Sequence, residues 1–175
     1  MSGSSIRPHL NPAATAVPAD APVLISDAPV LSADESQRLI RSAIAVSARA
    51  YAPYSQFRVG AALLTADGQT FVGCNIENAS YSLTLCAERV AAVAAIAAGC
   101  HDWRAIVIAS PGGVTPCGAC RQFLAEFSAG LLVITVDIQD GTHRHHQLQQ
   151  LLPQSFGRQS LPVATQGSLG ETVVS

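Results

Sequence analysis

An apolar stripe at helical spacing follows Ser32 and predicts the first element of the chain. Its members are Leu39, Ile40, Ile44 and Val46. The preceding "SADE" is a capping box, in which Ser32 caps the helix start and Glu35 reaches back to it. We expect this helix to end at Pro53, within "YAPYS".

The next pattern is typical of two strands. "RVGAALLTADGQTFVGCNIE", from Arg58 to Glu77, holds two apolar runs separated by Asp67-Gly68, a strong hairpin turn. An alanine-rich helix is expected from about Cys86 to Ala98, where Gly99 stops it.

The remaining elements alternate. "RAIVIAS" predicts a buried strand that ends at Pro111, "PCGACRQFLAEFS" a helix, and "LLVITVD" another buried strand. "HRHHQLQQLLPQSFG" predicts a short strand and a helical turn. The order helix, hairpin, helix, strand, helix, strand indicates an α/β fold in which helices cover a sheet.

The two ends of the chain differ from this domain. Residues 1–31 hold five of the ten prolines and are interpreted as a flexible tail. Residues 32–161 are interpreted as one folded domain, and residues 162–175 as a polar C-terminal tail. No apolar run approaches the roughly 20 residues that span a bilayer. The first 31 residues lack the continuous apolar segment of a signal peptide, so we expect a cytoplasmic protein without a membrane partner.

Composition narrows the partners. The chain has a net charge of −2 and 5% aromatic residues, and its ten basic residues are all arginine. Nucleic-acid binders usually have a basic stripe or stacking aromatics. We therefore expect no nucleic-acid partner.

The cysteines carry the first candidate chemistry. Cys117 and Cys120 form a C-x-x-C at a predicted helix start, which alone fits a redox dithiol, half of a zinc site, or chance. Cys86, also at a helix start, is the natural third ligand of a catalytic zinc site, which leaves its fourth position to water. Helix starts favour thiolates. Arg89, one turn further on, either offsets the charge of three thiolates or is a solvated surface side chain.

Glu88 is the second candidate for a chemical role. Helical side chains lean toward the N-terminus, so Glu88 can reach back past Cys86 toward the activated water without binding the metal. It can take the proton from the water and pass it on, and the neighbouring anionic centre keeps its proton affinity high. Packing roles are assigned to Cys74 and Cys100. The three histidines His143, His145 and His146 are assigned to a solvated loop or a strand edge.

The motifs together resemble a known family. Cys86-Ala87-Glu88 followed by Pro116-Cys117-Gly118-Ala119-Cys120 is the signature of zinc deaminases. "YSQFRVGAAL", "NIENASY", "CAER", "PCGACRQ" and "LLPQSFG" make the domain similar to cytidine deaminases of the short, homotetrameric type that acts on free nucleosides.

The resemblance implies a three-layer α/β/α fold around a mixed five-stranded sheet, and hydrolysis of cytidine or deoxycytidine to uridine or deoxyuridine. It implies one zinc ion on Cys86, Cys117 and Cys120, with Glu88 protonating N3 of the base. It also implies a set of substrate-binding residues. Asn75 and Glu77 bind the ribose hydroxyls, Phe57 and the backbone at Ala87 contact the base, Ala79 and Tyr81 complete the nucleoside segment, and Phe156 reaches a neighbouring subunit's site.

Three alternatives stay open. One is a deaminase for an aminopyrimidine antibiotic of the blasticidin S type. Another is a non-catalytic domain with a closed zinc site, for which Cys74 or His101 would be the fourth ligand. The last is a redox protein that uses Cys117 and Cys120.

Overall fold

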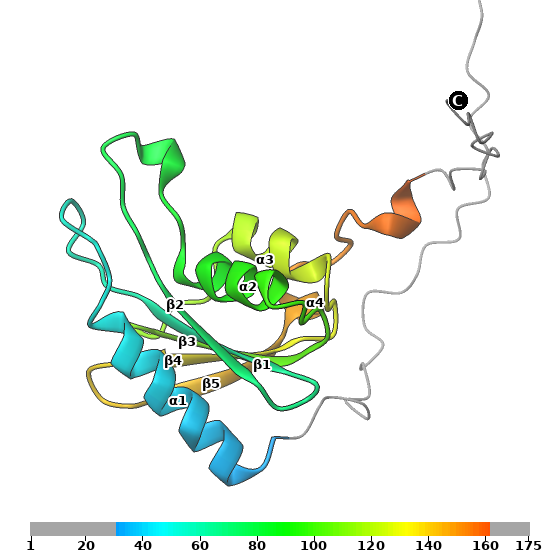
Figure 1. Cartoon of the computed structure of the whole chain (residues 1–175), viewed down its shortest axis with the longest axis horizontal. Helices are drawn as coiled ribbons and strands as arrows, with labels where there is room; N and C mark the ends of the chain where they lie inside the picture. The colour runs from blue at the N-terminus through cyan, green and yellow to red at the C-terminus, as the bar shows by residue number, and fades with distance from the viewer. Residues whose placement is uncertain (1–30, 162–175) are drawn as a thin grey trace, which may run out of the picture.

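The computed structural model describes residues 31–161 (Figure 1). The predicted tails, residues 1–31 and 162–175, lie outside the described residues apart from Leu31. In chain order the elements are α1 (Ala33–Ser47), β1 (Gly60–Thr65), β2 (Thr70–Cys74), η1 (Tyr81–Leu83), α2 (Ala87–Ala97), β3 (Trp103–Ser110), α3 (Gly118–Ala125), β4 (Leu132–Asp137), β5 (His143–Gln147), α4 (Leu148–Leu151) and η2 (Arg158–Ser160).

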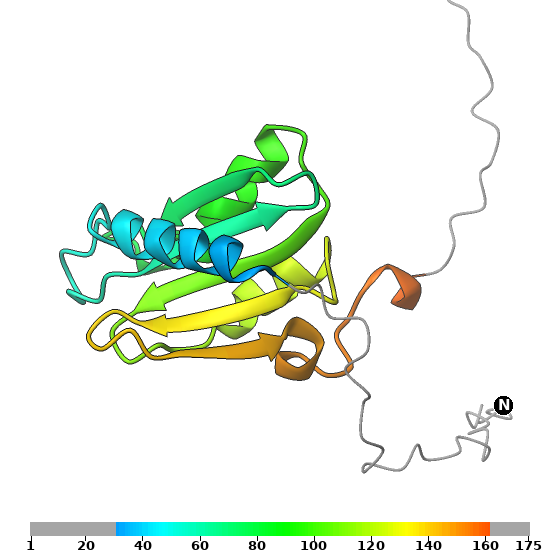
Figure 2. The ribbon, with the colours of Figure 1, turned by 90° about the horizontal axis from the view of Figure 1, so that it is seen from below.

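The strands form one mixed five-stranded sheet in the order β2-β1-β3-β4-β5. β3 and β4 are parallel, and the other neighbours are antiparallel. Helix α1 covers one face of the sheet, and α2 and α3 cover the other (Figures 1 and 2). The predicted α/β class and its three layers are therefore confirmed. Within residues 31–161, no helix combines the length and apolar character needed to cross a membrane.

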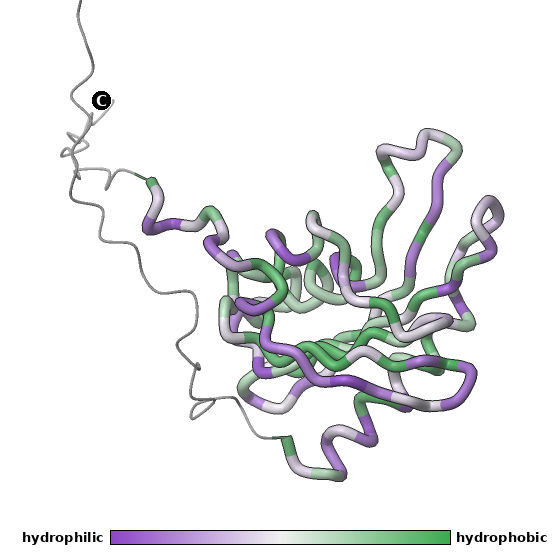
Figure 3. The backbone as a smooth tube through the Cα atoms, turned by 180° about the vertical axis from the view of Figure 1, so that it is seen from behind, coloured by the Kyte–Doolittle hydropathy of each residue, from purple (hydrophilic) through white to green (hydrophobic). Residues whose placement is uncertain are grey.

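The central strands β1, β3 and β4 are mostly apolar because both of their faces are covered. On β1, Ala61 and Leu63 pack in the core beneath α2 and α3, whereas Ala62 and Leu64 pack in the core beneath α1. The middle of the sheet accordingly carries the hydrophobic colour in Figure 3. This rigid centre holds the N-terminal ends of α2 and α3 in fixed positions.

Helix α1 begins as predicted and ends earlier. The Ser32 hydroxyl accepts a hydrogen bond from the Glu35 backbone, and the Ser32 backbone donates to the Glu35 carboxylate. The helix ends at Ser47, so the prediction that it runs to Pro53 is wrong. The backbone of Tyr51 instead pairs with the segment after β2: its N–H donates to the Asn75 carbonyl at 3.0 Å. This tertiary pairing outcompetes a further helical turn.

Glu35 makes stability depend on pH. Its carboxylate accepts hydrogen bonds from the Ser32 backbone and from Arg104 (2.9 Å), and these lower the pKa of Glu35 from 4.5 to about 2. A lowered pKa in the folded state contributes stability above the unfolded pKa, and this contribution is lost as pH falls toward 2. We expect urea unfolding to show a steeper loss of stability between pH 5 and pH 2 in the wild type than in Glu35→Gln. Parallel curves would contradict the assignment.

A second prediction concerns the contact between α2 and the edge strand β2. A Cβ added at Gly73 would lie 2.4 Å from the Ala91 nitrogen and 2.6 Å from the Ala87 oxygen, both backbone atoms of α2. Gly73→Ala must therefore push this helix outward, and we expect a loss of about 1–3 kcal/mol or more in unfolding free energy. Gly130→Ala, where an added Cβ meets nothing within 4 Å, is the matched control. Equal stability of the two variants would refute the close approach.

Candidate active site

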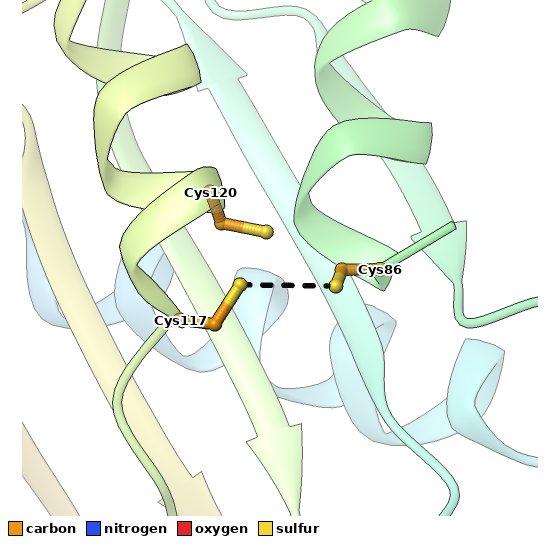
Figure 4. Close-up of side chains that lie close together, drawn as sticks. All are labelled: Cys86, Cys117 and Cys120. Carbon is orange, nitrogen blue, oxygen red and sulfur yellow. Dashed lines mark hydrogen bonds between the residues drawn. The ribbon is translucent and has the colours of Figure 1, made fainter. Parts of the chain in front are cut away.

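The candidate site lies where the N-terminal ends of α2 and α3 meet. Cys86 is the N-cap residue of α2, Cys117 is the N-cap residue of α3, and Cys120 lies in the first turn of α3. Figure 4 shows the three sulfur atoms pointing toward one another from these two helices. The helices place side by side three thiols that are separated in the sequence.

The spacing of the sulfur atoms suits a metal ion. All three Sγ atoms lie within 4.8 Å of one another, and those of Cys86 and Cys117 are 4.0 Å apart. Tetrahedral zinc, with zinc–sulfur bonds of about 2.3 Å, places two sulfur ligands about 3.8 Å apart. The three cysteines are unpaired, and their donor set and spacing fit zinc.

The Arg89 side chain lies beside the thiol cluster. Its Nη2 lies 3.9 Å from the Cys86 sulfur and donates to the Thr84 carbonyl at 3.1 Å. A hydrogen bond from Cys120 lowers the pKa of Cys86 to about 5, and the Arg89 guanidinium adds to this effect. The partly buried Arg89 side chain thus lies against the thiol cluster.

Glu88 is buried beside the cluster, with 5% of its surface exposed. Burial raises the pKa of Glu88, and the nearby Cys86 thiolate raises it further. The carboxyl group therefore takes up a proton more readily than an ordinary glutamate. This is the property needed to move protons near neutral pH.

A cavity of about 330 Å³ opens over the cluster. Predicted site residues line it: Phe57, Asn75, Glu77, Cys86, Ala87, Glu88 and Cys117. Other lining residues, among them Ser55, Thr84 and Thr115, were not predicted. They carry no recognisable spacing of their own, although Ser55 lies two residues before Phe57.

Two polar side chains hold one wall of the cavity together. The Asn75 amide donates to the Phe57 carbonyl and accepts from the Val59 backbone, both at 2.8 Å. The Glu77 carboxylate accepts from the Tyr54 backbone at 2.8 Å and from the Ser55 hydroxyl. The Ser55 hydrogen bond is the main cause that lowers the pKa of Glu77. Glu77 is therefore an anionic acceptor at this wall.

Three of the predicted substrate-binding residues lie apart from the cavity. Tyr81 is 74% exposed and lines an adjoining hollow of about 400 Å³, which shares Ser55, Glu77 and Thr84 with the cavity. Ala79 is exposed on the arm that projects between β2 and α2 (Figure 1). Phe156 is 62% exposed on the segment after α4.

The other cysteines and the histidines lie elsewhere. Cys74 is half-buried on β2, and Cys100 is half-buried beside the Gln69 side chain. His143, His145 and His146 lie on β5, an edge strand of the sheet. Among the described residues, the side chains grouped closely enough to hold a metal ion are those of Cys86, Cys117 and Cys120. Cys74, Cys100, His101 and the three histidines of β5 are not in this group.

The protein thus combines an α/β/α fold with three thiols and a buried carboxyl group that meet at the N-termini of two helices. These features define the class of zinc-dependent deaminases. The model of the cytidine and deoxycytidylate deaminase zinc-binding region matches residues 33–136. The chain belongs to this family.

Relatives agree with this assignment. A cytidine deaminase from Sporosarcina psychrophila is 40% identical over 132 residues, which cover 74% of this chain and 97% of the relative. One from Halalkalibacterium halodurans is 44% identical over 124 residues, or 70% of this chain and 94% of the relative. The crystal structure of cytidine deaminase from Burkholderia pseudomallei matches with a TM-score of 0.66 and 46% identity, covering 69% of this chain and 98% of that one.

Proposed function

We propose that the protein is a cytidine deaminase, which adds water to free cytidine or deoxycytidine and releases uridine or deoxyuridine and ammonia. The observation that carries the proposal is the position of Glu88. Its carboxyl group is 5% exposed and lines the same cavity as Cys86 and Cys117. Such an enzyme would serve pyrimidine salvage in the cytoplasm, where thiols stay reduced.

Cys86, Cys117 and Cys120 would hold the zinc ion. When bound, zinc lowers the pKa of a water molecule toward 7 and so supplies a nucleophile. A closed structural zinc site would need Cys74 or His101 as its fourth ligand. Among the described residues, neither side chain belongs to the group formed by the three cysteines. This supports a site with a position open to solvent and substrate. Arg89, next to Cys86, would offset the negative charge of the thiolates.

Glu88 would move the protons of the reaction. It would take one from the attacking water and deliver it to N3 of the pyrimidine, and it would then help to protonate the departing amino group. Burial and the Cys86 thiolate raise the pKa of Glu88, which supports a carboxyl group able to hold a proton between these steps.

The opposite wall would bind the nucleoside. The Glu77 carboxylate and the Asn75 amide would bind the ribose hydroxyls, and Phe57 and the backbone of Ala87 would contact the base. Asn75 already uses one N–H and one lone pair of its amide to hold the strand at Phe57 and Val59. Its second N–H and its remaining lone pair are the groups left for the sugar.

The subunits would assemble as a homotetramer in which Phe156 reaches a neighbour's site and Ala79 and Tyr81 complete nucleoside binding. Large apolar side chains on the surface support this assembly: Tyr81 is 74% exposed, Leu83 63% and Phe156 62%. Light scattering should give about four times the 18.1 kDa mass of the chain. A monomer of full activity would refute the shared site.

The direct test follows the loss of cytidine absorbance and the release of ammonia. We expect both with the zinc-loaded protein and neither after treatment with a chelator. Blasticidin S should not compete with cytidine; preferential turnover of the antibiotic would favour the alternative deaminase. Zinc binding without any deamination would favour a structural domain.

The proposal also predicts which substrates are refused. An anionic Glu77 at the sugar wall would repel the phosphodiester of a polynucleotide. A lost hydrogen bond to a charged group costs about 1.5–3 kcal/mol, so 3′-deoxycytidine should show kcat/KM lower by about 10–100-fold. Single-stranded DNA or RNA containing cytosine should remain unchanged after incubation and sequencing. Efficient conversion to uracil would overturn the free-nucleoside assignment.

A further inference from the structure

Arg121, in the first turn of α3, forms hydrogen bonds to Thr115 and Pro116, the loop that leads into the thiol cluster. Its Nε donates to the Pro116 carbonyl at 2.7 Å, and its Nη2 donates to the Thr115 hydroxyl at 3.0 Å. Cys117 follows directly and makes no side-chain cap on the helix. The approach of Cys117 to the cluster is therefore fixed from the side by Arg121.

The same guanidinium group holds a second part of the chain. Its Nη1 donates to the carbonyl of Leu151, the last residue of α4, at 2.7 Å. The next residue, Gln122, donates from Nε2 to the Phe156 carbonyl at 2.8 Å. Two successive side chains of α3 thus hold the C-terminal segment, residues 151–156, and one of them also holds the cysteine loop.

Leu151 at the start of this segment also packs against the hydrophobic core, and the bonds from Arg121 and Gln122 hold the segment at its two ends. The backbone N–H of Leu152 donates to Leu148, and that of Ser160 donates to Gly157, so both bonds are local. The Phe156 side chain is 62% exposed and contributes little packing. A planar guanidinium can donate in three fixed directions at once, whereas a lysine ammonium is a point charge that cannot match this set.

We propose that Arg121 is a positioning residue that couples metal binding at Cys86, Cys117 and Cys120 to the order of residues 151–156. The inference rests on the zinc site of the proposed function. A metal ion bound to Cys117 would fix the preceding loop, and with it the two acceptors of Arg121 on Thr115 and Pro116. The Arg121 guanidinium, held in this way, would in turn hold the Leu151 carbonyl. By reciprocity, an ordered segment strengthens metal binding by the same factor. Metal binding thereby fixes the position of the exposed Phe156 side chain.

The test compares zinc affinity and segment order in the full chain. Competition with a chromophoric chelator should show zinc binding about 10–100-fold weaker in Arg121→Lys than in the wild type. Hydrogen exchange of residues 152–157 should become about tenfold faster when zinc is stripped from the wild type. In Arg121→Lys it should be fast with or without zinc.

Arg104→Lys is the matched control, because Arg104 lies on β3 and forms an ion pair with Glu35 of α1 at 2.9 Å. It should lose stability and keep its zinc affinity. If Arg121→Lys does not fold, Thr115→Val removes one acceptor at nearly constant volume and should weaken zinc binding by about threefold or more. The inference would be overturned if every folded variant had wild-type zinc affinity, or if hydrogen exchange of residues 152–157 in the wild type were equally fast with and without zinc. Neither result would affect the proposed function. A wild-type chain that takes up no zinc would overturn the proposed function as well.

Discussion

Glu88→Gln is expected to lower kcat for cytidine by about 10²–10⁴-fold, the usual contribution of general acid–base catalysis. This corresponds to about 3–5 kcal/mol of activation free energy. The amide of glutamine keeps the size of the side chain and can still form hydrogen bonds, but it cannot accept and release a proton. Because the proposed cycle uses Glu88 more than once, the loss can exceed this range.

The same variant should keep its zinc and its fold. Glu88 is outside the group of three thiols, so zinc content should remain near one ion per chain. Replacing a buried carboxyl group, whose pKa burial has raised, by a neutral amide should not lower the unfolding free energy. Glu126→Gln, on the exposed C-cap of α3, is the matched control and should retain full turnover. Near-normal turnover of Glu88→Gln would show that another group carries the proton.

Much of the fold could be predicted because its elements begin with local chemistry. The Ser32–Glu35 capping box forms as the sequence indicates, and a turn with Gly68 at φ +87° joins β1 to β2. The end of α1 could not be predicted, because it depends on the pairing of Tyr51 with Asn75, a residue far along the chain. No local pattern announces a partner that only the folded sheet brings close.

The site divides in the same way. Three cysteines at predicted helix starts could be grouped, because helix N-termini and metal-ligand chemistry act on short stretches of sequence. The roles of Asn75 as a strand clamp and of Ser55 as a donor to Glu77 became visible only in three dimensions. Arg121 illustrates the limit best: its acceptor at Leu151 lies 30 residues away, on another helix.

Removal of one sulfur ligand is expected to abolish the metal centre. Cys86→Ala should reduce zinc from about one ion per chain to below about 0.1 after dialysis against a chelator, since binding free energy comes from the complete ligand set. Deamination should fall at least about 10³-fold, because water without zinc has a pKa of 15.7 and is a poor nucleophile at neutral pH. We expect the same of Cys117→Ala and Cys120→Ala.

The matched control is Cys74→Ala, which removes a half-buried thiol on β2 that lies outside the three-sulfur group. It should keep both zinc and activity. Alkylation provides a readout that does not depend on turnover: with zinc removed, Cys86 has its pKa lowered to about 5 and should react as a thiolate, whereas bound zinc should protect it. At pH 5, near the pKa of Cys86, Arg89→Ala should slow this alkylation in the zinc-free protein, because loss of a positive charge 3.9 Å from the sulfur lowers the fraction of thiolate. Full zinc content and activity in all three ligand variants would refute the metal site, and equal alkylation with and without zinc would refute the part assigned to Cys86.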